Sequence, residues 1–413
     1  MRRRDVLVAA GAASVGCAVG PEVPAPEPPE RFAGLVGLCD GAVPCGDDVR
    51  RAAAERIVTG LEAAGKSALV IEAGASMRWL TGVRWGLSER PLLFVLPVRG
   101  RPLWVGPAFE EARIHEGAGE GADVRTWQEH ESPYDVVAGA LGERQLDGPV
   151  EVDPFVRLFV AQGLGRHLQV DGGGQVLTSV RRVKQPAELA LMRQANEATK
   201  VALRAASEHI GEGMDDPAVR AVIREALETA GLTSVWVLGL CGPNAAFPHG
   251  TKHSHRLGPS DLVLVDCGGS LHGYQSDITR TWAAAGTPGD EVRRAFDAVL
   301  AAQTAGLKRF RAGVRCGEVD AAARASLTAA GFGEGYARFT HRLGHGIGVQ
   351  GHEEPYLVQG SDVVLAPGMT TSVEPGVYVP GAYGIRIEDI AAVTRGEPDI
   401  FGPRVQSLEA PFG

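Results

Sequence analysis

Residues 341–348 have the sequence HRLGHGIG, and the polar motif HEEP follows at residues 352–355. The glycines on either side of His345 carry no side-chain bulk, so the imidazole can reach inward from a tight backbone. A histidine alone is more often a satisfied core residue than a ligand. In the same part of the chain, however, four acidic residues stand at or within apolar strand patterns. Because buried charge must be paired or bound to a metal, we interpret the fold as one built around these side chains.

Two of the acidic residues lie on a predicted β-hairpin. The apolar strand of residues 262–265 ends at Asp266, and residues 274–281 are predicted to form the returning strand, with Asp277 in it. The two aspartates are 277 − 266 = 11 residues apart, a spacing that lets a hairpin bring both carboxylates to one point. In a chain with 50 acidic residues such a pair means little by itself.

The other two acidic residues also belong to strand patterns. Glu374 follows the apolar segment 369–373, and Glu388 alternates with Arg386 within the predicted strand 385–390. An ion pair between Arg386 and a carboxylate inside a barrel would explain the second strand alone. A charged side chain on the inward face of either strand is costly to bury unless an oppositely charged partner or a metal compensates it.

Together, the four carboxylates and one imidazole indicate a metal centre. Such an oxygen-rich donor set suits a pair of Mn²⁺ ions, with Co²⁺, Zn²⁺ or Fe²⁺ as substitutes. Paired ions about 3.5–4 Å apart hold a bridging water and lower its pKa, which generates hydroxide at neutral pH. The expected reaction is a hydrolysis.

Composition excludes several other classes of protein. With 413 residues and 44% hydrophobic content, the chain can bury a large core and is expected to hold two domains. A net charge of −9 without a basic stripe argues against nucleic-acid binding. Six cysteines are too few for a disulfide scaffold in so long a chain, although Cys39 and Cys45 could pair in an exported protein.

The first 46 residues are predicted to be a targeting signal followed by a linker. Residues 1–20 combine a run of arginines with a mildly apolar segment, which predicts an export signal of the twin-arginine type and is too short for a convincing membrane-spanning helix. The surroundings of Cys17 loosely resemble a lipidation site, which would anchor the protein to a membrane. Residues 21–46 are rich in proline and glycine and predict a linker. The alternative is a cytoplasmic protein with an irregular N-terminus.

Two domains are predicted after the linker. Residues 47–180 alternate helix and strand patterns, among them a buried strand at 67–72 and another at 92–96, as in a compact α/β unit without a phosphate-binding glycine motif. Residues 186–413 begin with two amphipathic helices, each with a proline in its first turn.

The motifs and their order resemble those of the pita-bread metallopeptidases, which include Xaa-Pro aminopeptidases, Xaa-Pro dipeptidases (prolidases) and methionine aminopeptidases, with creatinase as a metal-free relative. The resemblance extends from about residue 50 onward and implies an α+β fold, in which a C-terminal pita-bread domain follows a smaller α/β creatinase-type domain. It implies that Asp266 binds the first metal and that Asp277 and Glu388 bridge both metals. It further implies that His345 and Glu374 complete the coordination of the second metal, and that Glu374 moves a proton from the water to the leaving amine.

The resemblance also implies roles for residues beside the ligands. His249 lies 266 − 249 = 17 residues before the first aspartate, and His352 lies 352 − 345 = 7 residues after the ligand histidine. Both match positions that hold the scissile region of the substrate. His341 matches a position behind the ligands or facing the substrate, and Arg386 matches an arginine that orients a ligand carboxylate.

Within the family, the filled ligand positions disfavour a creatinase-like protein, and the two-domain length disfavours a methionine aminopeptidase. The interval from Glu374 to Glu388 and the HEEP motif look closer to prolidases, and homodimers are common in the family. Prolidases tend to carry an arginine shortly after this motif, which binds the terminal carboxylate of the dipeptide, and Tyr356 stands at that position here. An aminopeptidase acting on longer Xaa-Pro peptides, a hydrolase of a non-peptide amide such as an ectoine-type substrate, and a catalytically silent binding module therefore remain alternatives.

Overall fold

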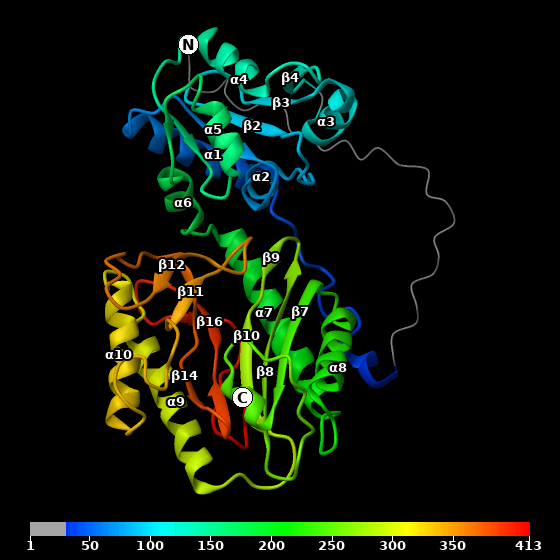
Figure 1. Cartoon of the computed structure of the whole chain (residues 1–413), viewed down its shortest axis with the longest axis vertical. Helices are drawn as coiled ribbons and strands as arrows, with labels where there is room; N and C mark the ends of the chain where they lie inside the picture. The colour runs from blue at the N-terminus through cyan, green and yellow to red at the C-terminus, as the bar shows by residue number, and fades with distance from the viewer. Residues whose placement is uncertain (1–29, 120) are drawn as a thin grey trace. The chain divides into compact units, whose positions relative to one another are not determined.

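The computed structural model describes residues 30–119 and 121–413, and these form two compact units (Figure 1). One unit is Cys45–Arg181, and the other joins residues 30–44 to Arg182–Gly413. The predicted export signal, Cys17 and the first part of the predicted linker lie outside the described residues. Within the described ranges, no helix is both long and apolar enough to cross a membrane.

The first unit is a six-stranded sheet flanked by helices, with strand order β4-β3-β2-β1-β5-β6. The central strand β1 pairs antiparallel with β2 and parallel with β5, and its five residues are all buried because the sheet is covered on both faces. The predicted α/β unit is thus confirmed. Its strands are β1 (Ala68–Glu72), β2 (Leu93–Pro97), β3 (Leu103–Pro107), β4 (Asp123–Trp127), β5 (Val150–Val152) and β6 (Val170–Asp171). Its helices are α1 (Asp47–Ala63), α2 (Ala75–Thr81), the 3-10 helix η3 (Ala108–Glu110), α3 (Glu111–Ala118), α4 (Pro133–Gly142), α5 (Leu158–Leu164) and α6 (Gln175–Arg181).

The second unit contains two larger sheets and one small hairpin. The first sheet has the order β10-β8-β7, with β9 paired to β8, and the second has the order β12-β11-β13-β16-β17. The hairpin is β14-β15. The strands are β7 (Thr233–Cys241), β8 (Leu262–Leu271), β9 (Tyr274–Gln275), β10 (Ile278–Ala283), β11 (Gly344–Gly346), β12 (Glu353–Leu357), β13 (Thr370–Val373), β14 (Gly376–Val379), β15 (Tyr383–Arg386), β16 (Asp389–Ala392) and β17 (Asp399–Ile400).

Helices enclose these strands from outside. Figure 1 shows α8 (Asp216–Thr229) alongside β7, and α9 (Asp290–Arg309) and α10 (Cys316–Ala329) on the opposite side of the unit. The helix α7 (Pro186–Ser207) begins, as predicted, with a proline in its first turn, and α8 is capped by the Asp215 carboxylate. Apolar side chains of α9, α10 and the second sheet form a shared core, which leaves the inner face of the strands for polar residues.

Part of the predicted linker is packed against the second unit. The 3-10 helix η2 (Glu30–Leu35) contacts α8. The side chains of Phe32 and Leu35 are only 1% and 4% exposed, and burial of these apolar side chains favours the packing. Among the described residues Cys39 is a buried free thiol, so the disulfide considered with Cys45 is absent.

Candidate metal centre

Strands β8 and β10 bring Asp266 and Asp277 together. The two strands pair antiparallel, with Asp266 opposite Thr279, and Asp277 directly precedes β10. The predicted hairpin is therefore confirmed, but its bounds differ: β8 continues past Asp266 to Leu271, and Asp277 stands between β9 and β10 and not within one strand. The backbone N–H of Asp277 donates to Asn196 on α7 at 3.2 Å, which anchors the loop that carries this carboxylate.

His345 is held by the backbone on both sides. A Cβ atom at Gly344 would lie 2.0 Å from the Ser372 carbonyl oxygen, and one at Gly346 would lie 2.3 Å from the Glu354 carbonyl oxygen. No side chain fits at either position, since both contacts are with backbone. The N–H of His345 donates to Ser372 Oγ at 3.0 Å, and that hydroxyl donates in turn to Glu374 at 3.0 Å.

Glu374 and Glu388 enter the site from strand ends. Glu374 follows β13, as the sequence predicts. Glu388 differs from the prediction, because it does not lie within one strand: it stands in the junction between β15 and β16. The chain changes partners there, since β15 pairs with β14 and β16 pairs with β13. The N–H of Glu388 donates to the Thr279 carbonyl at 3.1 Å, which joins this junction to β10.

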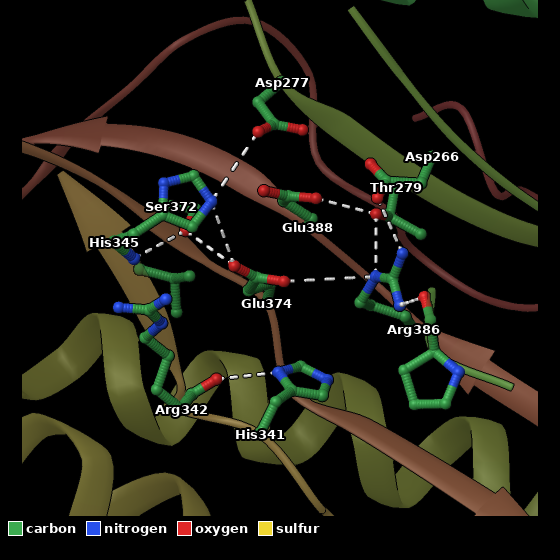
Figure 2. Close-up of polar contacts among 12 residues, drawn as sticks. Asp266, Asp277, Thr279, His341, Arg342, His345, Ser372, Glu374, Arg386 and Glu388 are labelled. Atoms are coloured by element: carbon green, nitrogen blue, oxygen red, sulfur yellow. Dashed lines mark hydrogen bonds and ion pairs between the residues drawn. The ribbon is translucent and has the colours of Figure 1, made fainter. Parts of the chain in front are cut away.

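The five predicted ligand side chains converge on one small volume (Figure 2). Donor atoms of Asp266, Asp277 and Glu388 lie within 4.8 Å of one another, and so do those of His345, Glu374 and Glu388. His345 Nε2 is 3.3 Å from Glu374 Oε1 and 3.6 Å from Asp277 Oδ2. Glu388 belongs to both groups, as a residue that bridges two ions would.

The chemistry of this site fits bound cations. Among the described residues, the buried oxygens Asp266 Oδ1 and Glu388 Oε1 have no hydrogen-bond partner. Unsatisfied buried carboxylate oxygens are costly, and a divalent ion would satisfy them. Burial, followed by the negative charge of Glu388, raises the pKa of Asp277 well above its ordinary value. Burial raises the pKa of Glu374 to about 7, although Arg386 opposes this. Without cations, the protein alone does not balance these carboxylates.

The predicted ligand His345 has the neutral form that metal binding requires. Burial, followed by the charge of His352, lowers the pKa of His345 to about 3, so the ring is neutral at physiological pH. His345 Nδ1 donates to the Gly346 carbonyl at 3.1 Å, which leaves Nε2 as the acceptor that faces the carboxylates.

Arg386 orients the acidic groups. Its Nη2 donates to Asp266 Oδ2 at 2.7 Å, and its Nε lies 4.0 Å from Glu374 Oε2. The same Nε donates to Thr279 Oγ1 at 3.0 Å, and Thr279 donates to Glu388 Oε2 at 2.7 Å. One guanidinium thus contacts or reaches three of the four carboxylates (Figure 2).

His341 lies behind the ligands. Its Nδ1 donates to the Arg342 carbonyl at 2.8 Å, so its Nε2 accepts from the Tyr378 hydroxyl at 2.7 Å. Tyr378 in turn accepts from Arg386 Nη1 at 3.0 Å. Burial, followed by the charge of Arg386, lowers the pKa of His341 to about 3. Both ring nitrogens are occupied, which favours positioning of Arg386 over substrate contact.

The two histidines predicted to hold substrate are exposed beside the site. The His352 ring lies 3.9 Å from the His345 ring, centre to centre, and its donor atom falls within 4.8 Å of those of Asp277 and His345. The adjoining Pro248 carbonyl accepts from Arg386 Nη1 at 3.1 Å, which attaches the segment carrying His249 to the centre.

The sequence prediction missed Thr279, Ser372 and Tyr378. Thr279 and Ser372 each stand two positions from a predicted ligand, Asp277 and Glu374, and a strand places such residues on one face. That period of two could have identified both. Tyr378 has no comparable local signal, because its partners lie 37 and 8 residues away.

Comparison with known proteins places both units in families. Residues 190–395 match the model of metallopeptidase family M24, and residues 54–152 match the creatinase/prolidase N-terminal domain. The probable dipeptidase PepE of Mycobacterium tuberculosis is 38% identical over 339 residues, which cover 80% of this chain and 88% of that protein. The Xaa-Pro dipeptidase of Lactobacillus delbrueckii subsp. lactis is 31% identical over 350 residues, covering 83% and 94%.

Solved structures agree in fold. The crystal structure of dipeptidase PepE from Mycobacterium ulcerans superposes with a TM-score of 0.83 at 35% identity, covering 89% of this chain and 99% of that one. The fold is the pita-bread fold preceded by a creatinase-type domain, as the sequence predicts. The chain is a metallopeptidase that belongs to family M24.

Proposed function

We propose that the chain is a dipeptidase that hydrolyses the bond before proline with two divalent metal ions, Mn²⁺ by preference. Asp266, Asp277, His345, Glu374 and Glu388 are the proposed ligands. The observation that supports the proposal is the convergence of these five side chains, with buried carboxylate oxygens that have no partner among the described residues.

The ions, when bound, supply Lewis acidity and lower the pKa of a water molecule. The chain's own residues do the rest. Glu374 accepts a proton from the attacking water and returns it to the proline nitrogen as the C–N bond breaks. The Ser372 hydroxyl fixes the Glu374 carboxylate for this transfer at 3.0 Å. His249 and His352 bind the scissile region, and His341 keeps Arg386 in place through Tyr378.

The relatives support the peptide substrate. Those 31–38% identical to this chain include proteins named dipeptidase and Xaa-Pro dipeptidase. Structural neighbours named aminopeptidases are 22–24% identical and share the fold. An Xaa-Pro dipeptide as substrate is therefore better supported than a longer peptide.

A substrate panel with metal analysis tests the proposal. The purified protein is stripped with a chelator, reloaded with Mn²⁺, Co²⁺, Zn²⁺ or Fe²⁺, and assayed on Ala-Pro, Ala-Pro-Ala, Ala-Ala and a non-peptide amide. We expect two bound ions per chain by elemental mass spectrometry, highest turnover of Ala-Pro with Mn²⁺, and loss of turnover after chelation. Equal cleavage of Ala-Ala and Ala-Pro, or full activity without metal, contradicts it.

We further propose export, lipid attachment at Cys17 and a homodimeric state. The arginine-rich start and the apolar segment after it support export. Cell fractionation with mass spectrometry of the mature N-terminus, and sedimentation of the purified protein, test these points. Full-length protein in the cytoplasm contradicts the first.

A further inference from the structure

One cation near the metal centre is not neutralised. Arg342 lies two residues before the start of β11, and its side chain is half-buried. Within the described residues, no hydrogen bond or ion pair is made by its guanidinium. The guanidinium lies over the ring of Tyr356 on β12, whose centre is 4.4 Å from Arg342 Cζ.

Arg386, the other arginine of the site, is different. It is 2% exposed, and its guanidinium donates to Asp266, Thr279 and Tyr378 and to the Pro248 carbonyl. Its hydrogen-bonding capacity is largely used by the protein. Arg342 retains all five N–H donors for a molecule that enters from solvent.

Arg342 is near enough to the centre to meet a substrate. Figure 2 shows its side chain extending toward His345. Tyr356, over whose ring the guanidinium lies, is the residue of β12 that pairs with the proposed ligand His345 of β11. Because directly paired residues of antiparallel strands point to the same face of the sheet, the guanidinium lies on the face that carries His345.

A dipeptide would place a carboxylate close to this position. In Xaa-Pro the carboxyl carbon is two bonds from the scissile nitrogen, which is about 2.5 Å. A residue that binds this carboxylate must therefore lie beside the metal centre. In a longer peptide the same carbon belongs to a neutral amide, which a guanidinium binds much less strongly.

We propose that Arg342, held in place by the ring of Tyr356, binds the free C-terminal carboxylate of an Xaa-Pro dipeptide and so selects dipeptides over longer peptides. The planar guanidinium matches a carboxylate with two parallel hydrogen bonds, and the ring restricts it to one orientation without using its donors. This inference rests on the proposed function and names the residues that set its substrate length.

The test compares a free and a blocked carboxylate on one scaffold. Wild-type protein, Arg342→Met and Arg342→Lys are assayed with Mn²⁺ on Ala-Pro and on Ala-Pro-amide. For Arg342→Met we expect kcat/KM for Ala-Pro to fall about 10- to 100-fold, mainly through KM, because a charge-assisted hydrogen bond is lost. The value for Ala-Pro-amide should change less than about threefold. Arg342→Lys should lie between, since it keeps the charge and loses the paired geometry.

Matched variants separate this role from general effects. Arg309 lies on α9 in an exposed ion pair with Glu318 at 3.0 Å, so Arg309→Met should behave as wild type on both substrates. Tyr356→Phe keeps the ring and should retain the preference for the dipeptide. Tyr356→Leu should lose part of it.

Inhibition by the product tests carboxylate binding without relying on the cleavage rates of the two substrates. Proline carries the free carboxylate and prolinamide does not, so Arg342→Met should weaken competitive inhibition by proline and leave inhibition by prolinamide unchanged. An equal fall for Ala-Pro and Ala-Pro-amide, or an unchanged ratio of the two, overturns the inference while the proposed function stands. Wild-type protein that cleaves neither substrate overturns both.

Discussion

Glu388 and Asp389 are consecutive and equally buried, at 1% and 0% exposure, yet their carboxylates have opposite surroundings. Asp389 accepts from Lys200 at 2.6 Å, from Arg280 at 2.8 Å and from Gln303 at 2.9 Å. Glu388 accepts from the Thr279 hydroxyl at 2.7 Å, and its other oxygen has no partner among the described residues. The chain therefore neutralises one of two adjacent charges and leaves the other exposed to the interior of the site.

The pKa values of the two groups follow this difference. Burial raises the pKa of an acid, but the charges of Arg280 and Lys200 hold the pKa of Asp389 below its ordinary value. Burial together with the charge of Glu374 raises the pKa of Glu388 well above its ordinary value. Asp389 belongs to a neutralised structural network, and Glu388 belongs to the proposed metal site, where bound cations would supply the missing positive charge.

Removal of Glu374 should have the largest effect on activity. Glu374→Ala removes both a proposed ligand and the proton carrier, so we expect kcat/KM on Ala-Pro to fall at least about 10²- to 10⁴-fold. The fold should survive, since this carboxylate is not part of the Asp389 network. Steady-state kinetics and circular dichroism measure the two outcomes. Near-normal turnover by the variant would remove the acid-base role.

Asp389→Asn should have the largest effect on stability. The substitution leaves Lys200 and Arg280 buried without their carboxylate, and breaking such a network costs about 3–5 kcal/mol. We expect the loss of unfolding free energy in urea to be similar with and without Mn²⁺, because this network does not face the metal centre. A loss below about 1 kcal/mol would show that the two cations are balanced elsewhere.

The metal-free protein should lose stability as the pH rises from about 6.5 through about 7, the pKa of Glu374 in the folded protein. The raised pKa of Glu374, about 7, together with those of Asp277 and Glu388, contributes stability at low pH that is lost as the pH rises through the folded values. The lowered pKa values of His341 and His345 act in the opposite direction, but only below about pH 6.5, where the unfolded imidazoles titrate. Above about pH 6.5 the carboxylates alone determine how the free energy of unfolding changes with pH.

Thermal melts of chelated and Mn²⁺-loaded protein across this range check the sign. The increase in Tm on adding Mn²⁺ should grow with pH, because the ligands must be deprotonated to bind metal. A difference that shrinks from pH 6.5 to pH 8 would contradict this assignment.

Glu388→Gln should have the smallest effect on the metal-free protein and provides the matched control for Asp389→Asn. Burial, followed by the charge of Glu374, raises the pKa of Glu388 well above its ordinary value and so favours the neutral acid, which glutamine nearly matches in shape. We expect a change below about 1 kcal/mol in chelator. The increase in Tm caused by Mn²⁺ should nevertheless be lost. A destabilisation equal to that of Asp389→Asn would contradict the comparison.

Patterns along the chain predicted the parts of this site that depend on local periodicity. The Asp266–Asp277 hairpin and the strand that ends at Glu374 follow from alternation and from apolar runs. The prediction that Glu388 lies within a strand was wrong. Arg386 and Glu388 alternate as they would in one strand, whereas the chain passes from one sheet to another there. A change of pairing partner is set by distant strands and leaves no local trace.

Side-chain networks were the other part that the sequence did not reveal. The Lys200 and Arg280 partners of Asp389 lie 189 and 109 positions away from it, and either could have been a surface residue by composition alone. Arg342 likewise differs from Arg386 only in what surrounds it. Such assignments require the folded chain.

The division of the proposed ligands between two sheets links metal retention to the integrity of the second unit. Asp266 and Asp277 come from the β8–β10 sheet, and His345 and Glu374 come from the sheet that contains β11 and β13. If the sheets separate on heating, no half keeps a complete set of donors, so cation release and irreversible inactivation should coincide in time. Storage life of the enzyme would then depend on free metal concentration in the buffer.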